Sequence, residues 1–119
     1  MAVTTTQTGK KGEEMACAFL LRKGFSLVLR NYRYGHQEID LVMRDADTLV
    51  FVEVKARSSV RFGTPAEFVT PVKQRRLLTA AQGYLLAHGL TDAPARFDVA
   101  EVYLDTGTVK HIENAFGLS

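Results

Sequence analysis

The alternation of apolar and polar residues between Glu38 and Arg57 constrains the fold more than any other feature of this sequence. Two alternating runs, 38–44 and 48–57, flank the turn-like tripeptide Asp45-Ala46-Asp47. This pattern is typical of two half-buried strands joined as an antiparallel hairpin. A two-residue turn at 46–47 accounts for it, and a longer loop that keeps the same pairing is equally compatible.

The apolar residues of this hairpin fix its register. They form the pairs Ile39 with Val54, Leu41 with Val52, and Met43 with Val50. A one-residue slip would turn this layer to solvent, so burial of the layer selects one register. The other face then carries the pairs Asp40 with Glu53, Val42 with Phe51, and Glu38 with Lys55. The sequence thus predicts two facing carboxylates, with the ammonium group of Lys55 close by.

Facing carboxylates repel each other unless something offsets their charge. A shared proton, a neighbouring cation such as Lys55, or a bound divalent metal would do so. Mg²⁺ and Mn²⁺ prefer oxygen ligands, and Asp40 with Glu53 meets that preference. Glu53-Val54-Lys55 alone is also compatible with a surface ion pair of little energetic value. The residues themselves leave both interpretations open.

Local signals predict the remaining elements. A helix is expected from about Lys11 to Lys23, a strand over 25–34, and an irregular connection over 58–70. Thr70 as N-cap and Pro71 at the first position begin a second helix that ends near His88. Strands at 96–104 and 108–112 form a final hairpin. The expected order is α-β-β-β-α-β-β, an α/β fold with a mixed sheet flanked by helices, comprising a single domain over 9–119 and a flexible tail over 1–8.

Composition excludes several classes of protein. The chain has 119 residues, 46% hydrophobic and 24% charged, which fits one globular domain and excludes a disordered chain. Its single cysteine, Cys17, excludes a disulfide framework and a cysteine-based zinc site. The longest apolar run, 15–21, is too short for a membrane span, and no signal peptide is recognisable. A cytoplasmic protein with no membrane association is expected.

Positive charge is concentrated in the first part of the chain. Residues 1–76 contain 13 Lys and Arg against 8 Asp and Glu, whereas residues 77–119 contain 2 against 5. A basic region of this kind suits a polyanion such as nucleic acid, although a solvated Arg-rich surface would look the same. The side chains expected to neutralise phosphates are Arg33, Arg57, Arg61, Lys73, Arg75 and Arg76.

A series of short motifs resembles a known family. The motifs, in chain order, are Gly9-x-x-Gly12-Glu13-x-x-Ala16, Asn31-Tyr32-Arg33, Glu38-Ile39-Asp40-Leu41, Phe51-Val52-Glu53-Val54-Lys55-Ala56-Arg57, Phe62-Gly63, Lys73-Gln74-Arg75-Arg76 and Arg96-Phe97-Asp98-Val99. This series resembles the YraN-like family of small bacterial proteins. That family is identified as a member of the PD-(D/E)xK superfamily, which has a restriction-endonuclease-like fold and includes the Holliday-junction resolvases.

The resemblance implies roles for particular residues. Asp40 and Glu53 would bind Mg²⁺ or Mn²⁺, with the Val54 carbonyl as a further ligand, and Lys55 would orient the attacking water or stabilise the transition state. Resolvases of this kind also use a glutamate of the first helix, which by position is Glu13. The residues alone do not separate Glu13 from Glu14, since either would favour the helix dipole.

The expected function is that of a Mg²⁺-dependent endonuclease acting on DNA, with branched or single-stranded forms among the candidate substrates. The alternatives are a nucleic-acid-binding module without efficient cleavage and a protein that docks an acidic partner. Gln74 would face the metal site and contact nucleic acid, or remain solvated. A homodimer is compatible with the resemblance, although no self-complementary apolar stripe stands out. Asp98 is expected to pair with a buried arginine, and His36, His88 and His111 to be structural or surface residues.

Overall fold

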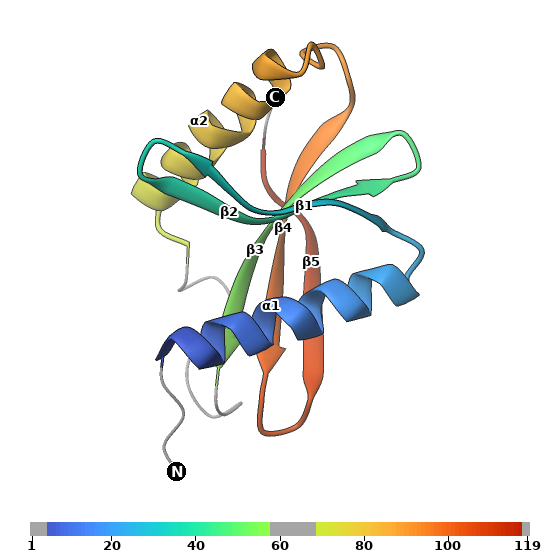
Figure 1. Cartoon of the computed structure of the whole chain (residues 1–119), viewed down its shortest axis with the longest axis vertical. Coiled ribbons are helices and arrows are strands. Elements are labelled where there is room, and N and C mark those ends of the chain that lie inside the picture. The colour runs from blue at the N-terminus through green and yellow to red at the C-terminus, as the bar shows by residue number, and fades with distance from the viewer. Residues whose placement is uncertain (1–4, 58–68, 118–119) are drawn as a thin grey trace.

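One five-stranded sheet carries a helix on each of its two faces (Figure 1). The computed structural model describes residues 5–57 and 69–117. Its elements, in chain order, are α1 (Thr5–Arg22), β1 (Ser26–Tyr34), β2 (Gln37–Asp45), β3 (Thr48–Arg57), α2 (Pro71–Ala87), β4 (Ala95–Tyr103) and β5 (Thr108–Phe116). The predicted fold class and element order are confirmed.

The strands lie in the order β1-β2-β3-β4-β5. Neighbours pair antiparallel except β3 and β4, which are parallel. A parallel pair needs a crossover connection, and the chain makes it through α2. The sheet is therefore mixed, as predicted, with β3 as its central strand.

The hairpin register predicted from the apolar layer is confirmed. Leu41 lies opposite Val52 and Met43 opposite Val50, while Asp45 pairs with Thr48 and leaves a two-residue turn at 46–47. The regular pairing of β2 with β3 ends at Leu41 and Val52. The predicted pairs beyond that point, which include Asp40 with Glu53, are therefore not ladder partners, and any contact between them depends on their side chains.

The two faces of the sheet bury separate clusters. The α1 face holds Leu41, Met43, Val50 and Val52 together with Ala16, Cys17 and Leu20. The α2 face holds Val42, Phe51 and Phe97 together with Leu77, Ala80 and Tyr84. Ile39 was predicted beside Leu41 but packs in the α2 cluster, so this prediction is wrong. The alternation of β2 is interrupted between Ile39 and Leu41, whose β1 partners flank Asn31, a residue with a left-handed φ of 53°.

Several predicted boundaries are corrected. Helix α1 begins at Thr5 rather than near Lys11, so residues 5–8 do not form a loose tail. A Cβ at Gly12 would lie 2.6 Å from the Cβ of Ala56. Because glycine has no Cβ, α1 can approach β3 closely at this position. Strand β5 extends to Phe116, four residues beyond its predicted end. The predicted connection over 58–68 and residues 1–4 lie outside the described residues.

Helix α2 begins as predicted. The Thr70 side chain accepts a hydrogen bond from the Lys73 amide, and Pro71 is the first helical residue. This capping satisfies an amide that would otherwise have no partner within the helix. Within the described ranges, neither helix is both long enough and apolar enough to cross a lipid bilayer.

Candidate functional site

The site lies where β2 and β3 separate. Beyond Leu41 the side chain of Asp40 takes the place of a backbone partner, and its Oδ2 accepts a hydrogen bond from the Val54 amide at 2.7 Å. Asp40 is thereby held at the open end of the hairpin, between the two strands. The bond engages the Val54 amide and not its carbonyl, whose role as a metal ligand stays a prediction.

The side chains of Asp40 and Glu53 interact, although the two residues are not the ladder partners that the register predicted. Burial raises the pKa of Asp40 from 3.8 to about 9, together with a hydrogen bond to Glu53 and the negative charge of that residue. The Val54 amide opposes this rise, and the charge of Glu13 adds to it. At neutral pH Asp40 therefore keeps its proton next to Glu53. A shared proton is one of the ways in which facing carboxylates are stabilised.

Lys73 supplies the cation beside Glu53. The Glu53 side chain is only 4% exposed, and the Lys73 Nζ lies 3.2 Å from its Oε2. Among the described residues Oε2 has no hydrogen-bond partner, so its contact with Lys73 is an ion pair without a hydrogen bond. Lys55 was predicted for this role, but among the described residues no ion pair joins Lys55 to Asp40 or Glu53. Lys55 is half-buried two residues further along β3, and its catalytic role stays a prediction.

A second group of carboxylates adjoins Asp40. One oxygen each of Glu13, Glu38 and Asp40 lies within 4.8 Å of the others, and all three residues are half-buried. The Asn31 amide nitrogen donates to Glu13 and to Glu38, at 2.9 Å in each case. Three converging carboxylates of this kind could hold a hard divalent cation. The structure thus separates Glu13 from Glu14, because only Glu13 belongs to this group.

Two members of the site were not identified from the sequence. Glu38 was placed opposite Lys55, although the strand alternation already put Glu38 and Asp40 on one face. Asn31 belonged to a motif of the resemblance but received no role. Its left-handed backbone, with φ of 53°, was not predictable from the strand pattern. Asparagine is one of the residues that adopt this conformation most readily, and that was the available signal.

The predicted nucleic-acid-binding residues lie in different environments. Arg33 is exposed and pairs with Glu38 at 3.5 Å. Arg57 ends β3, and its charge lowers the pKa of the buried Glu101 against the effect of burial. Gln74 donates to the Val69 carbonyl at 2.9 Å, so its amide is engaged locally rather than at the carboxylates. Arg75 and Arg76 are exposed on α2, and Arg61 lies outside the described residues.

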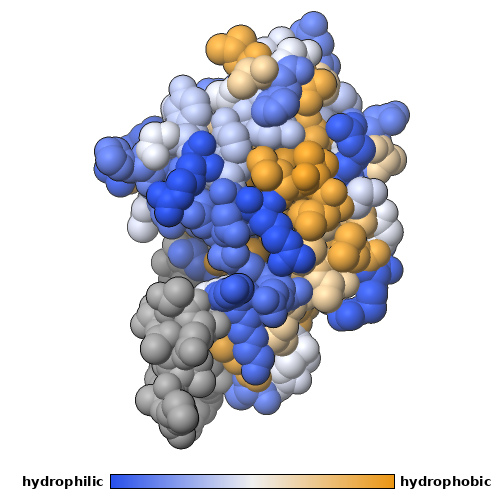
Figure 2. Space-filling model, viewed as in Figure 1, coloured by the Kyte–Doolittle hydropathy of each residue, from blue (hydrophilic) through white to orange (hydrophobic). Residues whose placement is uncertain are grey.

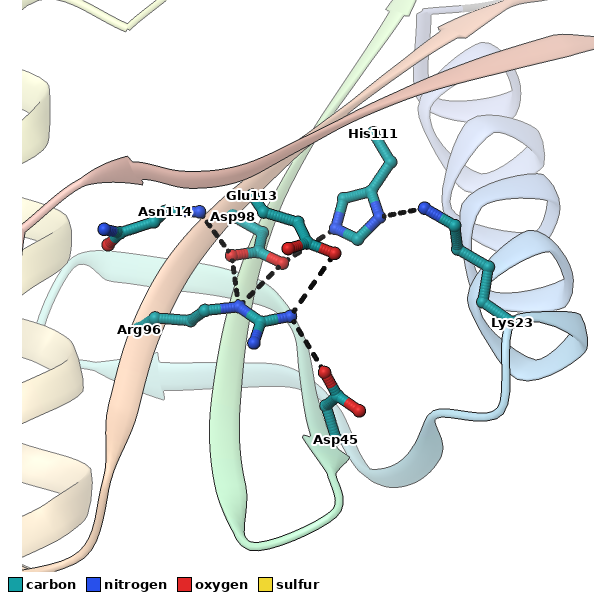
Figure 3. A network of polar contacts seen from close by, with 7 residues as sticks. All are labelled: Lys23, Asp45, Arg96, Asp98, His111, Glu113 and Asn114. Atoms are coloured by element: carbon teal, nitrogen blue, oxygen red, sulfur yellow. Dashed lines mark hydrogen bonds and ion pairs between the residues drawn. The ribbon is translucent and has the colours of Figure 1, made fainter.

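A separate polar network ties β4 to β5 (Figure 3). Asp98 is fully buried and accepts hydrogen bonds from Arg96 Nε at 3.0 Å, His111 Nε2 at 2.7 Å and the Asn114 amide at 2.9 Å. Burial raises the pKa of Asp98, but these hydrogen bonds outweigh that effect and hold the pKa below 3.8. Lys23 lies 2.9 Å from His111 Nδ1. The contact between Asp98 and Arg96 agrees with the expected partner, and His111 has a structural role.

An exposed apolar strand at the edge of the sheet is relevant to the predicted homodimer. Strand β1 is an edge strand, and Leu27, Val28 and Leu29 are each more than one third exposed. Figure 2 shows a hydrophobic patch on the side of the molecule where β1 lies, next to a largely hydrophilic surface. An exposed apolar edge strand is a surface that a second chain can pair with. The homodimer stays a prediction.

Comparisons with known proteins place the chain in a family. The model of the uncharacterised protein family UPF0102 matches residues 12–102. A UPF0102 protein of Ralstonia pickettii is 49% identical over 119 residues, covering 96% of this chain and 93% of that protein. A UPF0102 protein of Chlorobium chlorochromatii is 41% identical over 121 residues, covering 95% and 93%.

Among solved structures, the chain is similar to SfsA of Pyrococcus furiosus in complex with Ca²⁺. The TM-score is 0.40 and the sequence identity 16%, with 93% of this chain and 64% of that chain covered. The sequence matches are far closer and extend over nearly the whole length of the relatives. On the strength of the family model and of these relatives, the chain belongs to the UPF0102 family.

Proposed function

We propose that this protein is a metal-dependent nuclease that hydrolyses phosphodiester bonds in DNA. The observation that carries the proposal is the contact of the half-buried Asp40, which keeps its proton at neutral pH, with the buried Glu53, next to the half-buried Glu13 and Glu38. Bringing one buried and three half-buried acids together is costly for stability. Such a cost is typical of sites that bind a cation or carry out chemistry.

The residues present fit a divalent cation. All four side chains offer carboxylate oxygens, the ligands that Mg²⁺ and Mn²⁺ prefer. The buried Oε2 of Glu53 accepts no hydrogen bond from the part of the chain that the structure describes, and Asp40 holds a proton that a cation would displace. Asp40 and Glu53 would hold the ion, with Glu13 and Glu38 completing or outlining the site. A bound ion would lower the pKa of a water molecule and offset negative charge on a phosphate oxygen.

Basic side chains would orient Glu53, the attacking water and the substrate. Lys73 fixes the orientation of Glu53 by its ion pair. Lys55 is two residues from Glu53 on the same strand, and we assign it the role of orienting water or stabilising charge that the resemblance implies. Arg75 and Arg76 lie on the exposed side of α2, where they can neutralise phosphates of a bound strand. Nucleic acid as the partner belongs to this proposal.

Calorimetric titration with Mn²⁺ tests the metal site. Wild type should bind, and Asp40→Asn should abolish binding because it removes the anionic ligand. Glu13→Gln should weaken binding, whereas Glu14→Gln, a matched change at the neighbouring exposed residue, should leave it unchanged. The absence of Mn²⁺ binding to wild type would contradict the proposal and favour a protein that docks an acidic partner.

Cleavage assays separate the nuclease from a binding module. Linear duplex, single-stranded and four-way-junction DNA should be incubated with wild type and with Lys55→Ala in Mg²⁺. We expect cleavage of at least one substrate by wild type and a loss of about 100-fold or more in the variant. Cleavage that is undiminished in Lys55→Ala would point to a contaminating nuclease. Binding of DNA without any cleavage would favour the alternative function, a nucleic-acid-binding module.

A further inference from the structure

A cavity of about 620 Å³ lies between the turn that joins β1 to β2 and the first half of α2. One side is formed by Tyr34, His36 and Gln37, and the other by Val72, Arg75 and Arg76. Figure 1 shows this turn beside the start of α2. Pockets that hold small ligands have volumes of about 300 to 1,000 Å³. This groove is therefore large enough for one nucleotide.

Tyr34 presents an aromatic surface to this groove. Its neighbour two residues earlier, Tyr32, packs edge-on against Tyr84 and belongs to the core. Tyr34 is instead 46% exposed and lines the cavity. Its ring rests on α2 at Gly83, where an added Cβ would lie 2.3 Å from Cε2 of the ring. Because Gly83 has no side chain, the Tyr34 ring can pack against α2 at this position, and the rest of the ring stays exposed to a ligand.

The charge of the groove suits an anion. Arg75 and Arg76 are both exposed and line one wall, and His36 lies on the other. No acidic side chain is among the described residues that line the cavity. An aromatic ring beside two guanidinium groups is the combination with which proteins hold a base and its phosphate. Charge complementarity therefore favours a nucleotide over an apolar ligand.

Each wall of the groove contains a residue that directly precedes a residue of the carboxylate site in the sequence. Gln37 directly precedes Glu38, and Val72 directly precedes Lys73, the partner of Glu53. A strand that passes over Asp40 would thus place a neighbouring nucleotide at the groove. Adjacent residues link the two sites, so a nucleotide in the groove would help to position the bond that is cleaved.

We propose that this groove binds an unpaired nucleotide of a DNA strand, with its base stacked on Tyr34 and its phosphate held by Arg75 and Arg76. The inference rests on the proposed function and names its substrate as DNA with a single-stranded segment. In a duplex each base is stacked between its neighbours, so its face is not available to a side chain. Tyr34 can stack only on a base that is free of those neighbours.

Binding measured without divalent metal tests this proposal. Fluorescence anisotropy in EDTA should compare a labelled single strand with the duplex of the same sequence, using wild type, Tyr34→Leu and Tyr34→Phe. We expect tighter binding of the single strand, a loss of about 5- to 100-fold in Tyr34→Leu, and near wild-type affinity in Tyr34→Phe. Tyr103→Leu, a matched change of a half-buried tyrosine outside the groove, should bind as wild type does.

Gly83→Ala separates the position of the ring from its presence. The new Cβ displaces Tyr34, whose exposed side chain can move while the core stays intact. We expect a loss of affinity for the single strand with an unchanged melting temperature or a higher one. Quenching of 2-aminopurine placed in the strand reports stacking directly, and it should fall in both Tyr34→Leu and Gly83→Ala. Unchanged affinity and unchanged quenching in both variants would overturn the proposal.

The salt dependence of binding tests the contribution of Arg75 and Arg76. Each of Arg75→Ala and Arg76→Ala should reduce the slope of log affinity against log salt concentration by about 0.7 for a single strand. Arg44→Ala, an exposed arginine near the opposite end of β2, should not change it. Equal affinity of wild type for single strand and duplex would refute the groove. Strand binding in EDTA that persists in Asp40→Asn, with no Mn²⁺ binding by wild type, would refute the nuclease and leave the groove intact.

Discussion

Replacement of Asp40 by Asn should stabilise the protein in the absence of metal, increasingly so as pH rises. Burial and the contact with Glu53 raise the pKa of Asp40 to about 9, so the folded protein keeps a proton there at neutral pH. An unfolded chain releases that proton above about pH 4. Asparagine has the shape of a protonated aspartic acid, can accept from the Val54 amide and can donate to Glu53, yet has no proton to lose.

The magnitude follows from the number of protons released. Between pH 4 and 9 the unfolded state binds one proton fewer, so the free energy of unfolding of wild type falls by about 1.4 kcal/mol per pH unit. From pH 5 to pH 8 this amounts to at most about 4 kcal/mol. Asp40 is only half-buried, so solvent screening reduces this upper value and we expect about 2 to 4 kcal/mol. In Asp40→Asn this contribution is absent.

Urea denaturation of both proteins at pH 5, 6, 7 and 8 in EDTA provides the measurement. The difference in free energy of unfolding between Asp40→Asn and wild type should grow with pH, because the contributions of the histidines are common to both and cancel. Asp105→Asn, a matched change in an exposed turn, should track wild type. A difference that stays constant from pH 5 to pH 8 would refute the shared proton and the reasoning built on it.

Three further predictions concern packing and charge. Gly12→Ala should destabilise the fold by about 1 to 3 kcal/mol, since its Cβ would meet β3 at 2.6 Å, whereas Gly9→Ala, with open space around it, should stabilise α1 by up to about 1 kcal/mol. Thermal melts of the two variants distinguish these signs. Lys73→Met should cost about 1 to 3 kcal/mol in urea denaturation without metal, because it leaves Glu53 buried without its cation, and Lys73→Arg should restore most of the loss. The pKa of Asp98 is lowered in the folded protein, so its charge stabilises the fold above about pH 4, and this stability is lost as pH falls through that pKa. Asp98→Asn should therefore be less stable than wild type at pH 7 by about 3 to 5 kcal/mol. The difference in the free energy of unfolding should be smaller at pH 3.

Local patterns predicted the elements well because their causes are local. Thr70 and Pro71 specify the start of α2 through one capping hydrogen bond and one fixed dihedral angle. The start of α1 was missed because Gly9 and Gly12 weaken a helix considered alone. Only the approach of α1 to β3 shows why a glycine is favourable there.

The site was predicted in part. The register that buries Leu41 and Val52 predicted the contact of Asp40 with Glu53, but the strand pairing ends before these residues and only their side chains make the contact. The cation that pairs with Glu53 was not predicted, since Lys73 lies 20 residues beyond Glu53 on another element. Its approach depends on how α2 packs on the sheet rather than on strand periodicity.

The sequence by itself determined the element order, the hairpin register and the pairing of two acids, because the burial of an apolar layer permits only one alignment of β2 with β3. The tertiary structure alone decided where that alignment stops, how Asn31 joins Glu13 to Glu38, and which lysine reaches Glu53. Strand separation and helix placement result from sheet twist and from packing between distant segments, and no repeating pattern within one segment encodes them.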